Sequence, residues 1–150
     1  MTEGCAARAR VVACARAWLG TPYVHGASCR GGGADCLGLI RGVWRELLGP
    51  ERWSLPQYGP HWAESGDGDR LWQALTRHLV PLTQGDAAPG DVLLFRIGQR
   101  GAAKHLGIGT ALSQGGIGFV HSYACHGVVE SSLTAPWKRR LAARFAFPPR

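Results

Sequence analysis

The first half of the chain carries hydrophobic residues at the spacing of amphipathic helices. Residues 5–19 are rich in alanine, arginine and apolar residues at that spacing, and Gly20 is predicted to end the helix. A second helix is predicted from Asp35 or Cys36 to about Leu48, because its apolar residues form one stripe opposite arginine and glutamate. An aspartate at its first position suits a helix N-cap.

In the second half of the chain the apolar period shortens toward two, which is typical of strands. The remaining predicted elements are a short helix over residues 69–79 and strands over 92–97, 106–112, 118–123, 127–131 and 144–147. Helices followed by an antiparallel meander predict an α+β fold, with the N-terminal helices packed on one face of a small sheet of about five to six strands.

The segments between these elements are rich in glycine and proline. Residues 20–34 are predicted to form a glycine-rich loop and residues 49–66 an ordered surface loop. We find no internal repeat and no linker, so residues 1–150 are predicted to form a single domain, the size at which one core suffices.

Charge and hydropathy narrow the possible partners. The formal net charge is +7, but the basic residues are scattered and the run Lys138–Arg140 is short, so no specific nucleic-acid partner is expected. No apolar run approaches the roughly 18 residues that a membrane-spanning helix requires. Arginines interrupt the stretch where a signal peptide would be apolar, so we expect synthesis in the cytoplasm without a secretory signal.

The cysteines favour thiol chemistry over a disulfide framework or a metal site. There are five of them, an odd number, at positions 5, 14, 29, 36 and 125. No pair has the two- or three-residue spacing of zinc or iron–sulfur ligands, so neither a metal nor a cofactor is predicted. At least one thiol must be free.

Cys36 is the thiol with the most suggestive position. It lies in the first turn of the second predicted helix, where backbone N–H groups are expected to lower a cysteine pKa and favour the nucleophilic thiolate. The position of Cys36 alone is equally consistent with a small buried residue that has no catalytic role.

A nucleophilic cysteine needs a base and a group that orients the base. Among six histidines, His105 is predicted to open one strand and His121 lies in the next, so antiparallel pairing could bring them together on one face. One imidazole could then accept the thiol proton while the other fixes its tautomer. Either histidine alone would more simply be a core or surface residue.

Four segments, in this order, resemble the NlpC family of cell-wall cysteine peptidases. They are GTPYVHGASCRGGGADCLGLIRGVW, APGDVLLFRI, KHLGIGT and GFVHSYACHGVVESSL, which resemble the family's nucleophile segment, its Pro-Gly-Asp strand, its His-Val-Gly-Ile strand and its second histidine segment. The resemblance implies a papain-like fold and hydrolysis of peptidoglycan stem peptides, usually at the bond between γ-D-glutamate and a diamino acid.

Carried over position by position, the resemblance implies roles for five residues. Cys36 would be the nucleophile, His105 the general base and His121 the residue that orients it. Tyr23 would help to stabilise the oxyanion together with the Cys36 backbone N–H, and Asp35 would hold the free amino end of a stem peptide.

The chain also departs from the usual family pattern. Leu37 replaces a serine, Ala27 a glycine and His25 a common tyrosine. The Cys-Leu-Gly-Leu form of the motif and the tryptophans of residues 50–75 resemble the small peptidases of phage tails and phage-like gene transfer agents. That resemblance implies delivery in the tail tip to the wall of a target cell, with tail hub or baseplate proteins as partners.

Three other functions are consistent with the residues. The same fold could serve an acyl or amide transferase with another acceptor. A catalytically silent structural tail component would not require Cys36, His105 and His121 together. A basic nucleic-acid-binding module would show strongly salt-dependent binding that Cys36→Ala leaves unchanged.

Overall fold

The computed structural model describes residues 3–51, 53, 69–97, 101 and 103–149. Of the predicted loop over residues 49–66, residues 52 and 54–66 lie outside the described part. The helices are α1 (Glu3–Arg16), α2 (Cys36–Leu48), α3 (Asp69–His78) and α4 (Ala135–Arg140). The strands are β1 (Ser28–Cys29), β2 (Gly33–Ala34), β3 (Val80–Leu82), β4 (Val92–Arg96), β5 (Ala103–Ala111), β6 (Ile117–Tyr123), β7 (Gly127–Ser132) and β8 (Leu141–Ala146).

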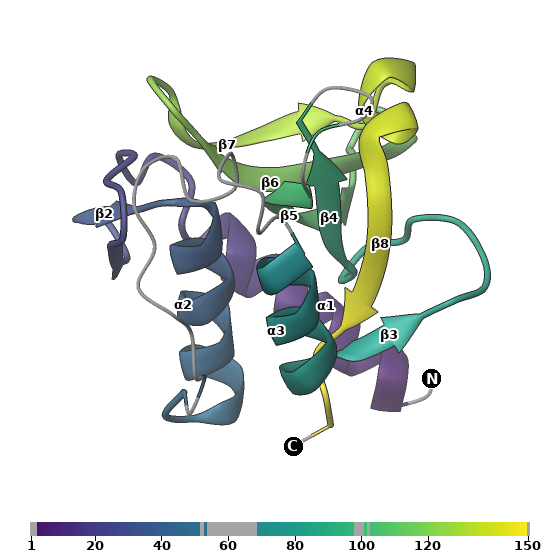
Figure 1. The fold of residues 1–150 in the computed structure, drawn as a ribbon, viewed down its shortest axis with the longest axis horizontal. Coiled ribbons are helices and arrows are strands. Elements are labelled where there is room, and N and C mark those ends of the chain that lie inside the picture. The colour runs from purple at the N-terminus through teal and green to yellow at the C-terminus, as the bar shows by residue number, and fades with distance from the viewer. Residues whose placement is uncertain (1–2, 52, 54–68, 98–100, 102, 150) are drawn as a thin grey trace.

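Six of these strands form one antiparallel sheet in the order β3-β8-β4-β5-β6-β7. The meander β4 to β7 follows the chain, and β8 returns to pair with the free edge of β4. Helices α2 and α3 both contact β5 of the sheet, and α4 lies at the end of the molecule opposite both termini (Figure 1). The predicted α+β fold, with the N-terminal helices packed on one face of a small antiparallel sheet, is confirmed.

The sequence of strand β4 is continuously apolar instead of alternating, because both faces of the strand are buried. Val92 and Leu94 belong to the main core beneath the helices, whereas Leu93 and Phe95 belong to a second cluster with α4. Successive side chains of a strand point to opposite faces, so a strand covered on both faces must be apolar throughout.

One glycine of α2 allows a close contact with the segment that follows α1. A side chain at Gly42 would begin 2.0 Å from the ring of Trp18, which is itself fully buried. The absence of a Cβ therefore lets α2 pack directly against Trp18, in the turn that follows α1.

Asp91, the aspartate of the Pro-Gly-Asp segment, ties three elements together. Its carboxylate is completely buried and accepts charged hydrogen bonds from Arg8 of α1 at 2.6 Å and Arg144 of β8 at 2.9 Å. The backbone N–H of Ala88 completes the set at 2.9 Å. A buried carboxylate is tolerated only when paired in this way, so Asp91 fixes β4 against both ends of the chain.

Several boundaries differ from the prediction because of tertiary contacts. Helix α1 ends at Arg16 instead of residue 19, since the following N–H groups bond three residues back and Gly20 donates to Val128 of β7. Strand β5 begins at Ala103, so His105 lies inside it and does not open it. Elements β1, β2, β3 and α4 were not predicted, because short segments gain stability from neighbours that local patterns do not reveal.

Within the described part of the chain, no helix combines the length and the apolar character needed to cross a bilayer.

Candidate active site

Cys36 is the first residue of α2 and is partly exposed at the bottom of a cleft. Asp35 caps the helix, because one carboxylate oxygen accepts the Gly38 N–H at 2.7 Å. The Cys36 thiol donates to the carbonyl oxygen of Lys104 at 3.6 Å, beside His105. The predicted placement of Cys36 at a helix N-terminus facing the strand of His105 is therefore observed.

A β-bulge shapes the strand opposite the thiol. Phe95 pairs with His105 and Arg96 with Ala103, so the register of β4 against β5 shifts by one residue at Lys104. Bulges bend a strand and redirect its groups, and they are common next to active sites. Here the bulge lies at the residue whose carbonyl faces the sulfur.

The expectation of a lowered cysteine pKa is wrong for the substrate-free state. Burial, followed by the negative charge of Asp35, raises the pKa of Cys36 to about 12. The backbone N–H groups of Leu106, Leu37 and Cys36 itself lower this pKa, but by less than burial raises it. At neutral pH the resting group is a thiol, which needs a base to remove its proton.

His105 and His121 are joined by a short hydrogen bond. Nε2 of His105 lies 2.7 Å from Nδ1 of His121, and the rings are nearly perpendicular. Nε2 of His121 lies 2.9 Å from Oγ of Ser131 on β7. The predicted meeting of two strand-borne histidines on one face is observed, and Ser131 extends it to a chain of three groups.

The chain of hydrogen bonds is compatible with the tautomers that a general base requires. If His105 carries its proton on Nε2, it donates to Nδ1 of His121, which then carries its own proton on Nε2 and donates to Ser131. This arrangement leaves Nδ1 of His105 with a lone pair, as a general base requires. Neutral His121 can also stabilise His105 once His105 becomes charged.

Aromatic side chains surround the histidine pair. The ring of His105 lies 6.1 Å from Phe95 and 5.6 Å from Trp137, and His121 lies 4.2 Å from Phe119, measured between ring centroids. Burial lowers the pKa of His105 to about 4. Burial, and secondarily His105, lowers the pKa of His121 to about 3. Both imidazoles are therefore neutral at physiological pH.

Tyr23 and Asp35 lie on the wall of the cleft formed by the glycine-rich loop. Burial, followed by the charges of Cys36 and Asp35, raises the pKa of Tyr23, and all three residues line the same cleft. The second carboxylate oxygen of Asp35 accepts the Gly26 N–H at 2.8 Å and lies 3.9 Å from Nδ1 of His25. Asp35 thus organises the loop as well as the helix.

The cleft has a volume of about 270 Å³ and brings four of the five predicted residues together, with His121 directly behind them. We call it the Cys36 cleft. It is lined by Tyr23, His25, Asp35, Cys36, Leu37, Ile97, Lys104, His105, Ser122, Tyr123 and Ala124.

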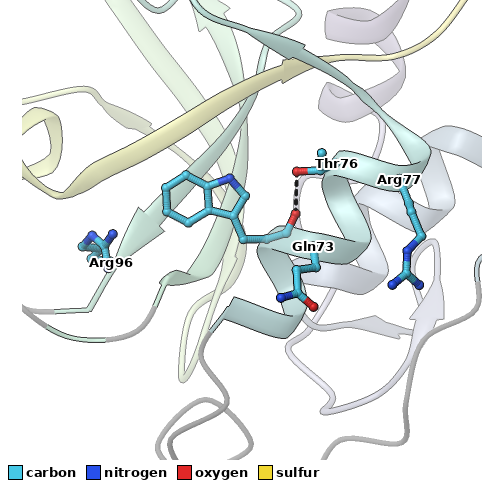
Figure 2. Close-up of a pocket in the computed structure, with 5 residues that line it drawn as sticks. Gln73, Thr76, Arg77 and Arg96 are labelled. Carbon is cyan, nitrogen blue, oxygen red and sulfur yellow. Dashed lines mark hydrogen bonds between the residues drawn. The ribbon is translucent and has the colours of Figure 1, made fainter.

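A larger depression, which we call the α3 hollow, lies elsewhere on the surface. Its volume is about 630 Å³, and it is lined by Trp72, Gln73, Thr76, Arg77 and Arg96. Arg96 and Arg77 lie on opposite sides of it, and Thr76 bonds back to its own helix (Figure 2). None of the predicted site residues lines it.

Sequence reasoning did not identify Ser131, Lys104 or Tyr123 as parts of the site. Ser131 sits beside His121 only because of the β6–β7 register, in which it pairs with Phe119. The bulge at Lys104 leaves no signal in the sequence that we can identify. Among the described residues, no cluster of three or more histidine, cysteine or acidic side chains is arranged to hold a metal ion.

Comparison with known protein families shows to which family the chain belongs. The model of the NlpC/P60 family matches residues 20–145, which include the cleft, the nucleophile segment and the sheet. The chain belongs to the NlpC/P60 family. Proteins of the NlpC/P60 family are generally cell-wall peptidases.

Solved structures of NlpC/P60 proteins share the fold. An NlpC/P60 family protein from Bacillus cereus is 19% identical with a TM-score of 0.62, covering 95% of this chain and 40% of that one. A lipoprotein-like NLP/P60 protein from Staphylococcus aureus is also 19% identical with a TM-score of 0.62, covering 100% and 43%. The chain thus spans about two fifths of either protein. No curated protein sequence matched the chain.

Proposed function

We propose that the chain is a cysteine endopeptidase that hydrolyses peptidoglycan stem peptides at the bond between γ-D-glutamate and a diamino acid. Family membership and the geometry of one cleft support this proposal. The observation that carries it is the Cys36 thiol held against the backbone beside His105, whose Nε2 is already engaged by His121.

Because Cys36 and His105 are both neutral in the resting enzyme, the thiol proton must be removed during the first step. As the sulfur of Cys36 attacks the scissile carbonyl carbon, Nδ1 of His105 takes the thiol proton, and the carbonyl π electrons move to oxygen. The hydroxyl of Tyr23 and the backbone N–H of Cys36 are available to stabilise the resulting oxyanion.

The remaining steps return each group to its starting form. The carbon–nitrogen bond breaks as protonated His105 gives its proton to the departing amine, leaving a thioester on Cys36. A water molecule then attacks the thioester while His105 accepts its proton. The carbon–sulfur bond breaks, the sulfur regains that proton, and the carboxylic acid is released.

The identity of the bond rests on the resemblance of the nucleophile segment and its neighbours to NlpC peptidases. Asp35 in this proposal attracts the free amino end of a stem peptide. Its two oxygens already accept backbone hydrogen bonds, and a carboxylate has further lone pairs for an ammonium group.

The test is digestion of purified diaminopimelate-type peptidoglycan by wild type, Cys36→Ala and Cys29→Ala, with released fragments identified by mass spectrometry. Cys29 is an exposed thiol outside the cleft and provides the matched control. New diaminopimelate amino ends from wild type and Cys29→Ala alone would support the proposal. Products joined to an added amine would instead favour the transferase alternative.

A folded wild-type protein that releases no fragments, although Cys36 reacts with iodoacetamide, would contradict hydrolysis by the isolated chain. An inert Cys36 would favour the structural alternative.

We further propose that the enzyme is carried in the tail tip of a phage or gene-transfer-agent particle and acts in the wall of the target cell. The Cys-Leu-Gly-Leu motif supports this route. Mass spectrometry of purified particles should find the chain together with tail hub or baseplate proteins, and its absence from tails would overturn the proposal.

A further inference from the structure

Tyr123 forms a wall of the Cys36 cleft that the proposed mechanism leaves without a role. It is the last residue of β6, and its side chain is 44% exposed although it lines the cleft. Its ring centroid lies 6.2 Å from that of His105 and 5.7 Å from that of His121. On the turn that follows, His126 stacks on it at 5.1 Å with an interplanar angle of 17°.

The β6–β7 turn holds this stacked pair in place. The N–H of His126 donates to the Tyr123 carbonyl at 2.9 Å, and Cys125 adopts a positive φ of 72° to close the turn. A Cβ at Gly127 would begin 2.4 Å from the carbonyl oxygen of Thr21, so this position requires glycine. The turn is therefore clamped to the start of the opposite loop, and the tyrosine–histidine pair forms a fixed surface.

The chemistry of peptide hydrolysis indicates which half of the substrate meets this surface. The base that removes the thiol proton must later protonate the departing amine, so that nitrogen must come within hydrogen-bonding distance of His105. Tyr123 adjoins His105, whereas Tyr23 and Asp35 lie beside Cys36 on the glycine-rich loop. A scissile bond placed between Cys36 and His105 would therefore have its amine side toward Tyr123 and its acyl side toward the glycine-rich loop.

We infer that the stacked Tyr123–His126 pair binds the amino acid on the amine side of the scissile bond and makes the enzyme selective for it. The ring of Tyr123 covers the alkyl chain of that residue. The exposed imidazole of His126 is placed to hydrogen-bond a polar group of the same residue, such as its carboxylate. This inference rests on the proposed peptidase function.

Two substrates with the same acyl group separate this role from a general structural one. We would compare L-alanyl-γ-D-glutamyl-diaminopimelate with the methyl ester of L-alanyl-γ-D-glutamate at its γ-carboxyl. Both form the same thioester, but only the first carries an amino acid on the leaving side. Contacts to the leaving residue therefore affect only the acylation step, and only with the peptide. Hydrolysis of the thioester is the same for both substrates.

For Tyr123→Ala we expect kcat/KM to fall about tenfold for the peptide, comparable to losing a few methylene contacts in an apolar pocket, and to change less than about twofold for the ester. Tyr123→Phe should resemble wild type, because the ring supplies the contact. His126→Ala should lower the peptide value alone, by about threefold, as expected for one exposed hydrogen bond. Val80→Ala, which removes an equally exposed apolar side chain outside the cleft, is the matched control.

Folding and nucleophile integrity are checked by the thermal midpoint and by alkylation of the Cys36 peptide, measured by mass spectrometry. Equal losses on both substrates would assign Tyr123 to the support of His105 and overturn the inference. Unchanged peptide hydrolysis would overturn it too. If wild type does not hydrolyse the peptide, whether or not it cleaves the ester, the proposed function itself fails. Peptide hydrolysis by wild type that Tyr123→Ala leaves unchanged refutes only the recognition of the leaving residue.

Discussion

The Cys36 cleft and the α3 hollow differ in how many elements supply their lining residues, and their volumes do not reveal this difference. The hollow is the larger, at about 630 Å³ against about 270 Å³. Four of its five lining residues belong to the single helix α3. The fifth, Arg96, lies 5.6 Å from the centre of the Trp72 ring. The cleft gathers groups from α2, β5, β6 and the glycine-rich loop.

The electrostatics of the two regions differ more than their shapes. In the cleft, burial raises the pKa of Cys36 to about 12 and lowers that of His105 to about 4, so both groups are neutral in the resting state and the proton moves only as the sulfur attacks. In the hollow, the exposed ends of Gln73 and Arg77 remain in water. Convergent polar groups with shifted pKa values are what mark an active site, and only the cleft has them.

Removal of the nucleophile should give the largest effect. For Cys36→Ala we expect peptidoglycan hydrolysis to fall by about 10⁴-fold or more, because no thioester can form. The measurement is the initial rate of fragment release. Cys29→Ala should keep the wild-type rate, and a Cys36→Ala protein with comparable activity would exclude the cleft as the site of chemistry.

Loss of the general base should have the next largest effect on the rate. His105→Ala is expected to lower kcat by about 10³-fold, within the range attributed to a positioned general base. Single-turnover measurement of thioester formation would show the loss in the acylation step. A variant that kept its kcat would indicate that another group deprotonates Cys36.

Removal of the orienting histidine should cost less. For His121→Ala we expect kcat to fall by about 10²-fold, since His105 keeps its place but loses the partner that fixes its tautomer and stabilises its charge. Ser131→Ala, one step farther along the chain, should change kcat by only about threefold. A larger effect for Ser131→Ala than for His121→Ala would contradict the proposed hydrogen-bond chain.

The pH dependence should be small over the range where an ordinary histidine titrates. A general base is active only when it is unprotonated. Because the pKa of His105 is lowered to about 4, its imidazole stays unprotonated as the pH falls from 7 to 5.5. We expect kcat/KM to change less than about twofold between pH 7 and 5.5, whereas a base with the usual pKa would lose about tenfold. An acidic limb centred near pH 6.5 would show that His105 is not shielded in the free enzyme.

The smallest effect is expected in the α3 hollow. Gln73→Ala and Arg77→Ala remove exposed side chains, which usually changes the free energy of unfolding by less than about 0.5 kcal/mol. We expect rates of hydrolysis within about twofold of wild type, measured on the same peptidoglycan. A tenfold loss would mean that the hollow extends the substrate site, and the contrast between the two regions would disappear.

The sequence allowed the longer elements to be predicted, and also which residues meet in the cleft. Helix α2 begins at Cys36 with Asp35 as its cap, since a helix start depends on a short acceptor side chain followed by an apolar stripe. His105 and His121 were paired correctly because an antiparallel meander places successive strands side by side. The segment resemblances also predicted the NlpC family, which the match over residues 20–145 confirms.

Other features could not be predicted because they depend on register and burial. The contact of Ser131 with His121 requires the register of β6 against β7, and the exposure of the Lys104 carbonyl to sulfur requires a bulge. The pKa of Cys36 was predicted in the wrong direction, because the helix N-terminus is local whereas the burial that outweighs it comes from the whole fold.

The sequence by itself determined which groups are available for chemistry: a thiol at a capped helix start, two histidines on adjacent strands, and a family pattern that orders them. Only the tertiary structure decided their state and surroundings. Phe95, Phe119 and Trp137 surround the imidazoles, and the clamped β6–β7 turn places Tyr123 against His105. Proton affinity and substrate contact depend on which distant residues exclude water, and that is set by packing across the sheet.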